Sequence, residues 1–291
     1  MQPDLRSQFL ELVRLAATDL PRDVERRIRE AREQETSGSA AQGALDTLLD
    51  NVALARKEST PICQDTGTPI FYVEHPPGWS TSQLRDEIEA AVVDATQKTY
   101  LRPNAVDAVS GENTGDNTGD EHYPTIHFSE GEGETLEVEL MLKGGGCENV
   151  SAQYKLPDSG LEAGRNLDGV RKAALKTVFD AQGKGCAPGA LGIAVGGDRG
   201  SSYVASKEAL FRDMDDVNPD PELADLEEKI TSQANQLGIG PMGFSGQTTV
   251  LGTKIKGLHR LPASYFVSVS YMCWAYRRRR MTYKNGDVTY H

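Results

Sequence analysis

Residues 190–197 read "ALGIAVGG", and a segment with helical character follows from Ser201. A short apolar run bounded by glycine and proline predicts a buried strand. A strand, a glycine turn and a helix in this order are typical of α/β folds. The N-terminus of such a helix could hold an anion. We therefore expect an α/β protein with this strand in its core.

The rest of the chain predicts a mixed α+β fold. Apolar residues recur at helical spacing in the N-terminal part, which predicts helices over residues 5–20, 22–35, 44–58 and 83–101. Further helices are expected over 167–181 and 221–237, and strands over 70–75, 249–257 and 264–273. Residues 125–146 predict two alternating strands about a glycine-containing turn, as in a β-hairpin. We expect a helical N-terminal region followed by α/β lobes with mixed sheets: one domain, 1–291, in two lobes at about 1–120 and 121–291.

The amino-acid composition disfavours several classes of function. The 291 residues include 43 Asp and Glu against 31 Lys and Arg, a net charge of -12. This balance disfavours a nucleic-acid partner, and the basic run at 277–280 is a weak indication of one. No apolar run approaches the roughly 18 residues of a membrane span, and the N-terminus is an acidic amphipathic helix rather than a secretory signal. We expect a cytoplasmic protein, whose acidic surface is an ordinary one or an adaptation to a high-salt cytoplasm.

The stretch "PICQDTGTP", residues 61–69, carries a thiol, an amide, a carboxylate and two hydroxyls between two prolines. Proline and glycine exclude a helix or a central strand here, so these groups lie on a tight turn. Rigid turns at the ends of elements are common places for ligand-binding and catalytic groups. Asp65 is the candidate acid–base residue of this turn, although capping a turn is its other common role.

Three of the four cysteines share such a setting: Cys63, Cys186 and Cys273 each lie at the end of an element or on a turn. A cytoplasmic chain rarely forms disulfides, and no C-x-x-C pair is present. Two alternatives remain open for three distant thiolates. One is a zinc site with a fourth ligand from elsewhere, and the other is a [4Fe–4S] cluster with one open iron. Arg102 and the glycine-rich segments could bind substrate carboxylates beside either metal.

Six motifs together resemble the class I, iron–sulfur fumarate hydratase / L(+)-tartrate dehydratase family, and within it the α-subunit or N-terminal portion. They span roughly residues 45–282 in order, and read "CQDTGTP", "LRPNAV", "ENTGDN", "KGGGCENVSA", "GKGCAPGALGIAVGGD" and "HRLPASYFVSVSYMCWAYRRR". Any one of them would be a weak signal, whereas six in order are a strong one. The resemblance implies a hydro-lyase whose lobes surround a [4Fe–4S] cluster.

The resemblance implies a role for each cysteine. The motif matches give the ligand role to Cys63, Cys186 and Cys273, with one iron left open to the substrate. Cys147 stands where the family commonly has serine, so it is expected to lie near the site without being a ligand.

The same matches imply the residues that bind and convert the substrate. Gln64 and Asp65 match a catalytic, substrate-contacting pair, and Arg102 matches an arginine that binds a substrate carboxylate. A glycine-rich substrate loop matches Gly145, Gly146 and Asn149. Single-chain relatives carry an active-site histidine twelve residues before the last ligand cysteine, where this chain has Leu261. His259 is the candidate to replace it as a catalytic residue, with an ordinary surface histidine as the alternative.

Finally, the resemblance implies a partner and a reaction. Single-chain relatives are about twice as long, and two-subunit members supply the remaining residues from a separate β-subunit. We therefore expect a hetero-oligomer, α2β2, that hydrates an unsaturated dicarboxylate. Fumarate and malate, from the tricarboxylic acid cycle, are the expected pair, and L(+)-tartrate and mesaconate are alternatives within the family. From a different class, a non-catalytic zinc-binding structural protein is the other reading.

Overall fold

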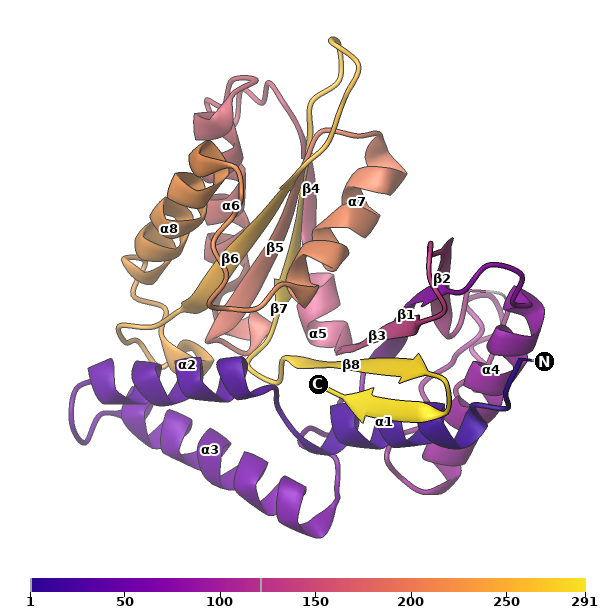
Figure 1. The fold of residues 1–291 in the computed structure, drawn as a ribbon. Coiled ribbons are helices and arrows are strands. Elements are labelled where there is room, and N and C mark those ends of the chain that lie inside the picture. Colours follow the sequence, from indigo (N-terminus) through magenta and orange to yellow (C-terminus); the bar gives the residue numbers. More distant parts are fainter. Residues whose placement is uncertain (1, 121) are drawn as a thin grey trace. The chain divides into compact units, whose positions relative to one another are not determined.

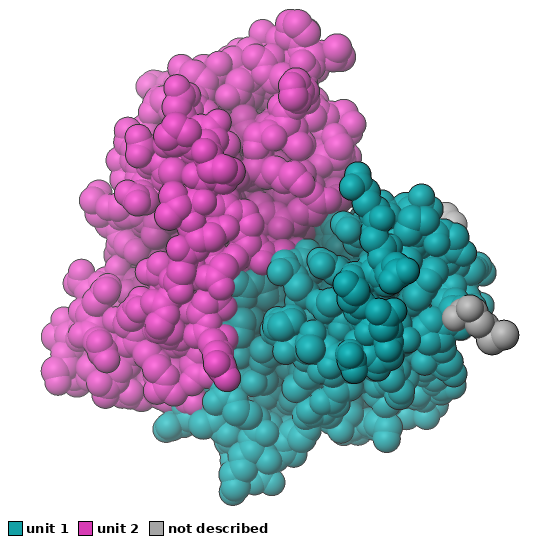
Figure 2. Space-filling view, viewed as in Figure 1, with its two compact units in different colours: residues 1–21, 50–145, 277–291 teal, residues 22–49, 146–276 magenta. Residues whose placement is uncertain are grey.

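The computed structural model describes residues 2–120 and 122–291 and contains the mixed helices and sheets of an α/β fold, as the sequence predicts (Figure 1). The chain divides into two compact units, each built from separate stretches of sequence (Figure 2). Unit 1 comprises residues 1–21, 50–145 and 277–291, and unit 2 comprises residues 22–49 and 146–276. Helix α3 (Ala40–Glu58) contributes residues to both units.

Unit 2 contains the strand that opened the sequence argument. Strand β5 (Gly189–Val195) is buried at every residue. It pairs in parallel with β6 (Val250–Gly257) and antiparallel with β7 (Phe266–Met272), and β4 (Ala152–Lys155) completes a sheet of order β4-β7-β5-β6. Residues buried along a whole strand need cover on both faces of the sheet. Helices therefore lie on both sides of it.

The covering helices of unit 2 lie on opposite faces of the sheet. Helix α7 (Arg199–Glu208) packs on β5 and β7, whereas α6 (Leu167–Ala181) and α8 (Pro221–Asn235) cover the other side (Figure 1). Helix α2 (Arg22–Gln34) also belongs to this unit, as do α5 (Gly145–Asn149) beyond its first residue and the short helices η1 (Gln182–Gly185), η2 (Ala209–Phe211) and η3 (Pro241–Gly243). The result is a three-layer α/β/α arrangement.

The N-terminus of α7 does not offer the free N–H groups that the sequence suggested for an anion. The carboxylate of Asp198 caps the helix and accepts hydrogen bonds from the N–H groups of Gly200 and Ser201, at 2.7 and 3.0 Å. The Ser201 hydroxyl in turn accepts a hydrogen bond from the N–H of Asp198, which completes a capping box. The protein thus supplies its own negative charge at this position.

Unit 1 is built on a five-stranded sheet of order β2-β1-β3-β8-β9. Its strands are β1 (Thr68–His75), β2 (Thr125–Glu130), β3 (Leu136–Lys143), β8 (Arg277–Lys284) and β9 (Asp287–Tyr290). The predicted strands at residues 125–143 are present, but their pairing as a hairpin was wrong. Strand β1 lies between β2 and β3, parallel to the first and antiparallel to the second. The arginine run at 277–280 begins a strand that is absent from the sequence prediction.

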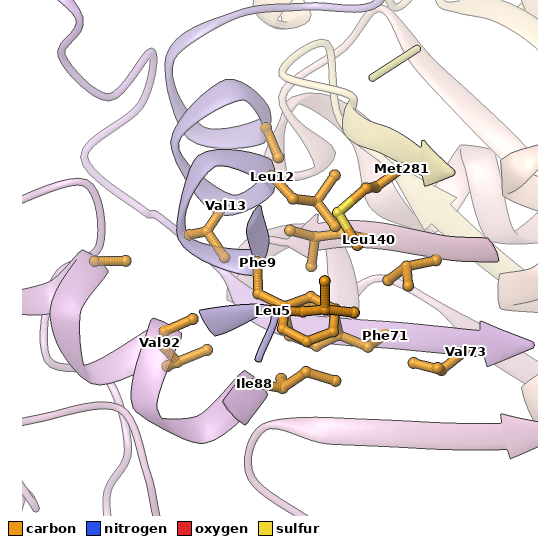
Figure 3. Packing of buried hydrophobic residues seen from close by; sticks show 14 of the residues in the cluster. Leu5, Phe9, Leu12, Val13, Phe71, Val73, Ile88, Val92, Leu140 and Met281 are labelled. Carbon is orange, nitrogen blue, oxygen red and sulfur yellow. The ribbon is translucent and has the colours of Figure 1, made fainter. Parts of the chain in front are cut away.

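The core of unit 1 lies between this sheet and two helices, α1 (Arg6–Thr18) and α4 (Thr81–Gln97). The apolar side chains of α1 recur at helical spacing, so Phe9 and Leu12 share one buried face. They pack beside Phe71, Leu140 and Met281 of three adjacent strands (Figure 3). This packing holds β1 in place, and the turn at residues 61–67 leads directly into that strand.

A substitution in unit 2 tests the packing of α7 on β5. A Cβ at Gly192 would lie 2.1 Å from the carbonyl oxygen of Ser206 and 2.6 Å from Leu210, so Gly192→Ala should lower the free energy of unfolding by about 1–3 kcal/mol. Gly43→Ala is the matched control, because a Cβ there meets nothing within 4 Å on helix α3. The control should raise stability by about 0.5–1 kcal/mol. Urea unfolding measures both, and equal effects would contradict the close packing.

Candidate functional site

The turn at residues 61–67 connects α3 to β1 and is held by hydrogen bonds within unit 1. The N–H of Ile62 donates to the carbonyl of Ala17 in α1, at 3.0 Å, and its carbonyl accepts from the side-chain amide of Asn51 in α3, at 2.8 Å. Ile62 and Thr66 are buried, whereas Cys63 and Asp65 are partly exposed and Gln64 is exposed. Apolar and polar side chains of the turn are thus separated, with the reactive groups accessible.

Gly67 allows this turn to pass close to the end of β3. Its φ of +79° lies in the left-handed region, which glycine adopts without strain. A Cβ there would lie 2.8 Å and 2.9 Å from the backbone carbons of Lys143 and Leu142. The N–H of Gly67 also donates to the Oδ1 atom of Asp65, at 3.0 Å. Only glycine fits both the conformation and the space.

The Asp65 carboxylate accepts a backbone hydrogen bond on each of its oxygens. Oδ1 accepts from Gly67, and Oδ2 accepts from the N–H of Gly145, at 2.8 Å. Gly144 leaves room for this contact, since a Cβ there would lie 2.9 Å from Oδ2. The carboxylate is therefore fixed in position. The structure places Asp65 directly against Gly145, one of the residues predicted for the substrate loop.

Arg102 also meets the turn. Its backbone N–H donates to the Thr66 hydroxyl, at 3.0 Å, and its Nη1 donates to the carbonyl of Gln64, at 3.1 Å. The residue as a whole is exposed. Unit 1 alone thus brings together Gln64, Asp65, Arg102 and Gly145 of the predicted site.

Two further residues beside Asp65 are absent from the sequence prediction. Burial raises the pKa of the Tyr123 phenol, a hydrogen bond with Thr68 lowers it, and the charge of Asp65 raises it. The Arg277 guanidinium is 1% exposed, and within the described residues its Nε and Nη1 have no hydrogen-bond partner. Its Nη2 lies 3.8 Å from the position that a Cβ of Gly144 would take, close to the Asp65 carboxylate. The site therefore has a buried positive charge beneath it.

The signal for Arg277 was present but was interpreted differently. In β8 it pairs with Leu142, a core residue of β3, so position 277 lies on the buried face of the sheet. A run of four arginines suggests a basic surface patch, whereas the structure buries the first two of them, Arg277 and Arg278, at the start of β8. Tyr123 belongs to none of the six motifs, so no sequence signal indicated it.

Cys186 and Cys273 belong to unit 2, where their chain segments meet. Cys186 follows η1 in a left-handed conformation with φ of +52°, and Cys273 directly follows β7. The carbonyl of Cys186 accepts the N–H of Trp274, at 3.1 Å, and thereby joins the two segments. Both cysteines are partly exposed.

Tyr271 lies among the thiols of unit 2. Burial raises the pKa of its phenol, and the charges of Cys273, Cys147 and Cys186 raise it further. Cβ atoms at Gly185 and Gly189 would lie 2.6 Å and 2.4 Å from its ring, so these glycines make space for it.

Cys147 differs from the other three cysteines because it is buried. Its Sγ lies 4.0 Å from the Sδ atom of Met272. Partial exposure of Cys63, Cys186 and Cys273 suits groups that bind a metal or a ligand, and burial suits an inert thiol. Cys63 belongs to unit 1, and within either unit the described residues include no group of three His, Cys, Asp or Glu side chains arranged to hold a metal ion.

The remaining predicted residues lie in unit 2. Gly146 and Asn149 are exposed on α5, and a Cβ at Gly146 would lie 3.8 Å from the carbonyl oxygen of Lys184, two residues before Cys186. His259 is exposed on the loop after β6, where its carbonyl accepts the N–H of Gly197, at 3.0 Å. Leu261, at the family position of the histidine, is 72% exposed on the same loop.

Comparison with known proteins gives consistent results. A family model described as "Fumarate hydratase (Fumerase)" matches residues 6–282. The chain is 48% identical over 277 residues to a putative fumarate hydratase class I of Geobacillus stearothermophilus, covering 94% of this chain and 54% of the relative. It is 35% identical over 276 residues to a putative L(+)-tartrate dehydratase subunit alpha of Methanocaldococcus jannaschii, covering 92% of this chain and 94% of the relative.

A third relative is a second alpha subunit. The L(+)-tartrate dehydratase subunit alpha of Escherichia coli K12 is 30% identical over 279 residues, covering 95% of this chain and 89% of the relative. The chain therefore spans about half the length of the Geobacillus relative and most of the length of the two alpha subunits. Among the described residues, no helix is both long and apolar enough to cross a membrane.

Two glycines with the same φ separate backbone strain from steric fit at the turn. Gly67 and Gly78 both have φ of +79°, but only Gly67 approaches the backbone of another strand. Gly78→Ala should cost about 1–2 kcal/mol of unfolding free energy from the left-handed conformation alone. Gly67→Ala should cost about 1–3 kcal/mol more, because its methyl group meets β3. Equal costs in chemical unfolding would contradict the close approach of the turn to β3.

Proposed function

Since the chain belongs to the fumarate hydratase family, we propose that it is the α-subunit of a [4Fe–4S]-dependent hydro-lyase that interconverts a 2-hydroxy dicarboxylic acid and its unsaturated dicarboxylate. The observation that best supports this proposal is the turn at residues 61–67. It carries Cys63, Gln64 and Asp65 in succession, and two backbone hydrogen bonds hold the Asp65 carboxylate in position. Arg102 is hydrogen-bonded to the same turn. Fumarate and malate are the proposed pair, because the relative of highest identity reported above is a class I fumarate hydratase.

The donor set suits an iron–sulfur cluster. Cys63, Cys186 and Cys273 are partly exposed, the last two on segments joined at Cys186 and Trp274, and the fourth cysteine is buried. Soft thiolates select Fe–S clusters or zinc over hard cations. Cys63, Cys186 and Cys273 would hold the cluster. Its open iron would supply a Lewis acid for the hydroxyl group of the substrate.

The protein's own residues then handle the carboxylate and the proton. Arg102 binds a substrate carboxylate through the exposed part of its guanidinium, a charge-assisted contact. Asp65 moves the proton at the carbon next to that carboxylate, and its two backbone hydrogen bonds keep it oriented for the transfer. Gln64 is the neighbouring polar contact, and the exposed Gly146 and Asn149 of α5 complete the substrate loop with Gly145. His259 is the proposed second proton-handling group.

The proposed partner is a β-subunit, in an α2β2 hetero-oligomer. Two relatives that this chain covers to 94% and 89% are named alpha subunits of L(+)-tartrate dehydratase. The Geobacillus relative is about twice as long as the matched region. In the proposed assembly the β-subunit would contribute the remaining part of the active site, and the enzyme would work in the cytoplasm.

The cysteine assignment predicts a difference between four variants. Cys63→Ser, Cys186→Ser and Cys273→Ser should each lose the [4Fe–4S] cluster, since a hydroxyl is a poor ligand for iron compared with a thiolate. Cys147→Ser is the matched control and should retain the cluster. Iron and acid-labile sulfide analysis of protein purified without oxygen measures the loss. A full cluster in the Cys186 variant would contradict the ligand set, and one zinc per chain without sulfide would favour the non-catalytic reading.

The two substrate-handling residues should fail in different ways. Arg102→Met should raise KM for fumarate, because it removes the carboxylate contact. Asp65→Asn is nearly isosteric but cannot accept a proton, so kcat should fall by a factor on the order of 10²–10⁴. Steady-state kinetics of the enzyme assembled with its β-subunit separates the two effects, and the iron content of each variant serves as the control. Near-normal turnover of Asp65→Asn with its iron in place would assign the proton to another group.

A further inference from the structure

Thr66 belongs to the turn at residues 61–67, here called the reactive turn, and is fully buried, with 0% of its surface exposed. Its Oγ1 accepts two hydrogen bonds from one neighbouring segment. The donors are the backbone N–H of Arg102 and the side-chain amide Nδ2 of Asn104, each at 3.0 Å. A single hydroxyl therefore joins the turn that carries Asp65 to the segment that carries Arg102.

The segment at residues 102–104 is held from its other side by Asn117. This residue is also fully buried, and its φ of +62° is in the left-handed region. Its Oδ1 accepts the N–H of Asn104, at 2.7 Å, and its Nδ2 donates to the carbonyl of Arg102 and to the Thr96 hydroxyl of α4. Arg102 thus lies between two buried polar side chains, one from the reactive turn and one anchored to a core helix.

Buried polar groups lose more free energy than exposed ones when a partner is removed. Without the Thr66 hydroxyl, the N–H of Arg102 and the amide of Asn104 would both lack their acceptor. Donors that lose their acceptor destabilise the folded state, so the segment would shift to find other partners. A shift of Arg102 would also break the hydrogen bond from its guanidinium to the Gln64 carbonyl.

We propose that Thr66 is a positioning residue that couples the carboxylate-binding Arg102 to the turn bearing Gln64 and Asp65. The inference rests on the proposed function for the roles of these three residues. The hydroxyl fixes the separation between the group that binds one carboxylate and the group that moves the neighbouring proton. Displacement of such groups by about 1 Å can lower a rate by about 10²-fold.

The test compares Thr66→Val, which keeps the shape of the side chain and removes the hydroxyl, with Thr66→Ser, which keeps the hydroxyl. Thr66→Val should lower kcat/KM for fumarate by about 10²-fold, through both a higher KM and a lower kcat, with unchanged iron content. Thr66→Ser should restore most of the activity. Thr177→Val is the matched control, since Thr177 is also buried but bonds only within unit 2, and it should leave kcat/KM unchanged.

A double-mutant cycle distinguishes positioning from a general structural role. Thr66→Val should change kcat/KM little when Arg102→Met is already present, because the residue that it positions has been removed. Independent, multiplicative losses would overturn the proposal. If Arg102→Met alone has no effect, the proposed function fails rather than the link between Thr66 and Arg102.

Amide hydrogen exchange tests that link without any assay of activity. In Thr66→Val, exchange should become faster at Arg102, whose N–H has lost its acceptor, and stay unchanged in α6. Unchanged exchange at Arg102 would overturn the inference whatever the kinetics show. Should Thr66→Val not fold, Asn104→Ala removes one of the two bonds to the hydroxyl and should lower kcat/KM by about tenfold. Wild-type kcat/KM in that variant would contradict the proposal.

Discussion

The Asp65 carboxylate, bonded to the backbone N–H groups of Gly67 and Gly145, is the contact on which the site depends. One bond closes the turn on itself, and the other joins the turn to the residues that follow β3. Both bonds need close backbone approach, which the glycines at 67 and 144 permit. Replacing either of these glycines would therefore alter the geometry of the turn.

From this contact the arrangement of unit 1 follows. The strand pair β1 and β3 brings residue 68 beside residue 143, so the turn before β1 and the glycines after β3 meet at one end of the sheet. Thr66 then binds the segment of Arg102, which in turn is held by Asn117. Groups separated by up to 80 residues in sequence are thus held by one continuous set of hydrogen bonds.

Two arginines near Asp65, Arg277 and Arg102, lie in different surroundings. Arg277 is buried close to Asp65, and its Nε and Nη1 have no hydrogen-bond partner among the described residues. The phenol of Tyr123 is hydrogen-bonded to Thr68. Arg277 is thus buried near the Asp65 carboxylate, whereas Arg102 is exposed beside the turn.

Local pattern predicted the elements better than their pairing. Strand β5 and the helices α1, α3, α4, α6 and α8 follow from apolar periodicity, which is a local property. The insertion of β1 between β2 and β3 depends on contacts distant in sequence, which no turn signal reports. The strand that contains Arg277 was not predicted, because a run of charged residues does not show the apolar pattern of a strand. Asp65, Arg102 and Gly145 were predicted from motifs, whereas the role proposed for Thr66 rests on its buried contacts, which no motif indicates.

The central claim is that this chain holds an iron–sulfur cluster that binds a dicarboxylate beside Asp65 and Arg102. The most direct measurement is the Mössbauer spectrum of the ⁵⁷Fe-reconstituted protein with its β-subunit, recorded without oxygen before and after L-malate is added. The account predicts that one iron site of a [4Fe–4S] cluster changes its parameters on addition, because one iron has no cysteine ligand. A spectrum with no such cluster, or one that no dicarboxylate alters, would contradict it.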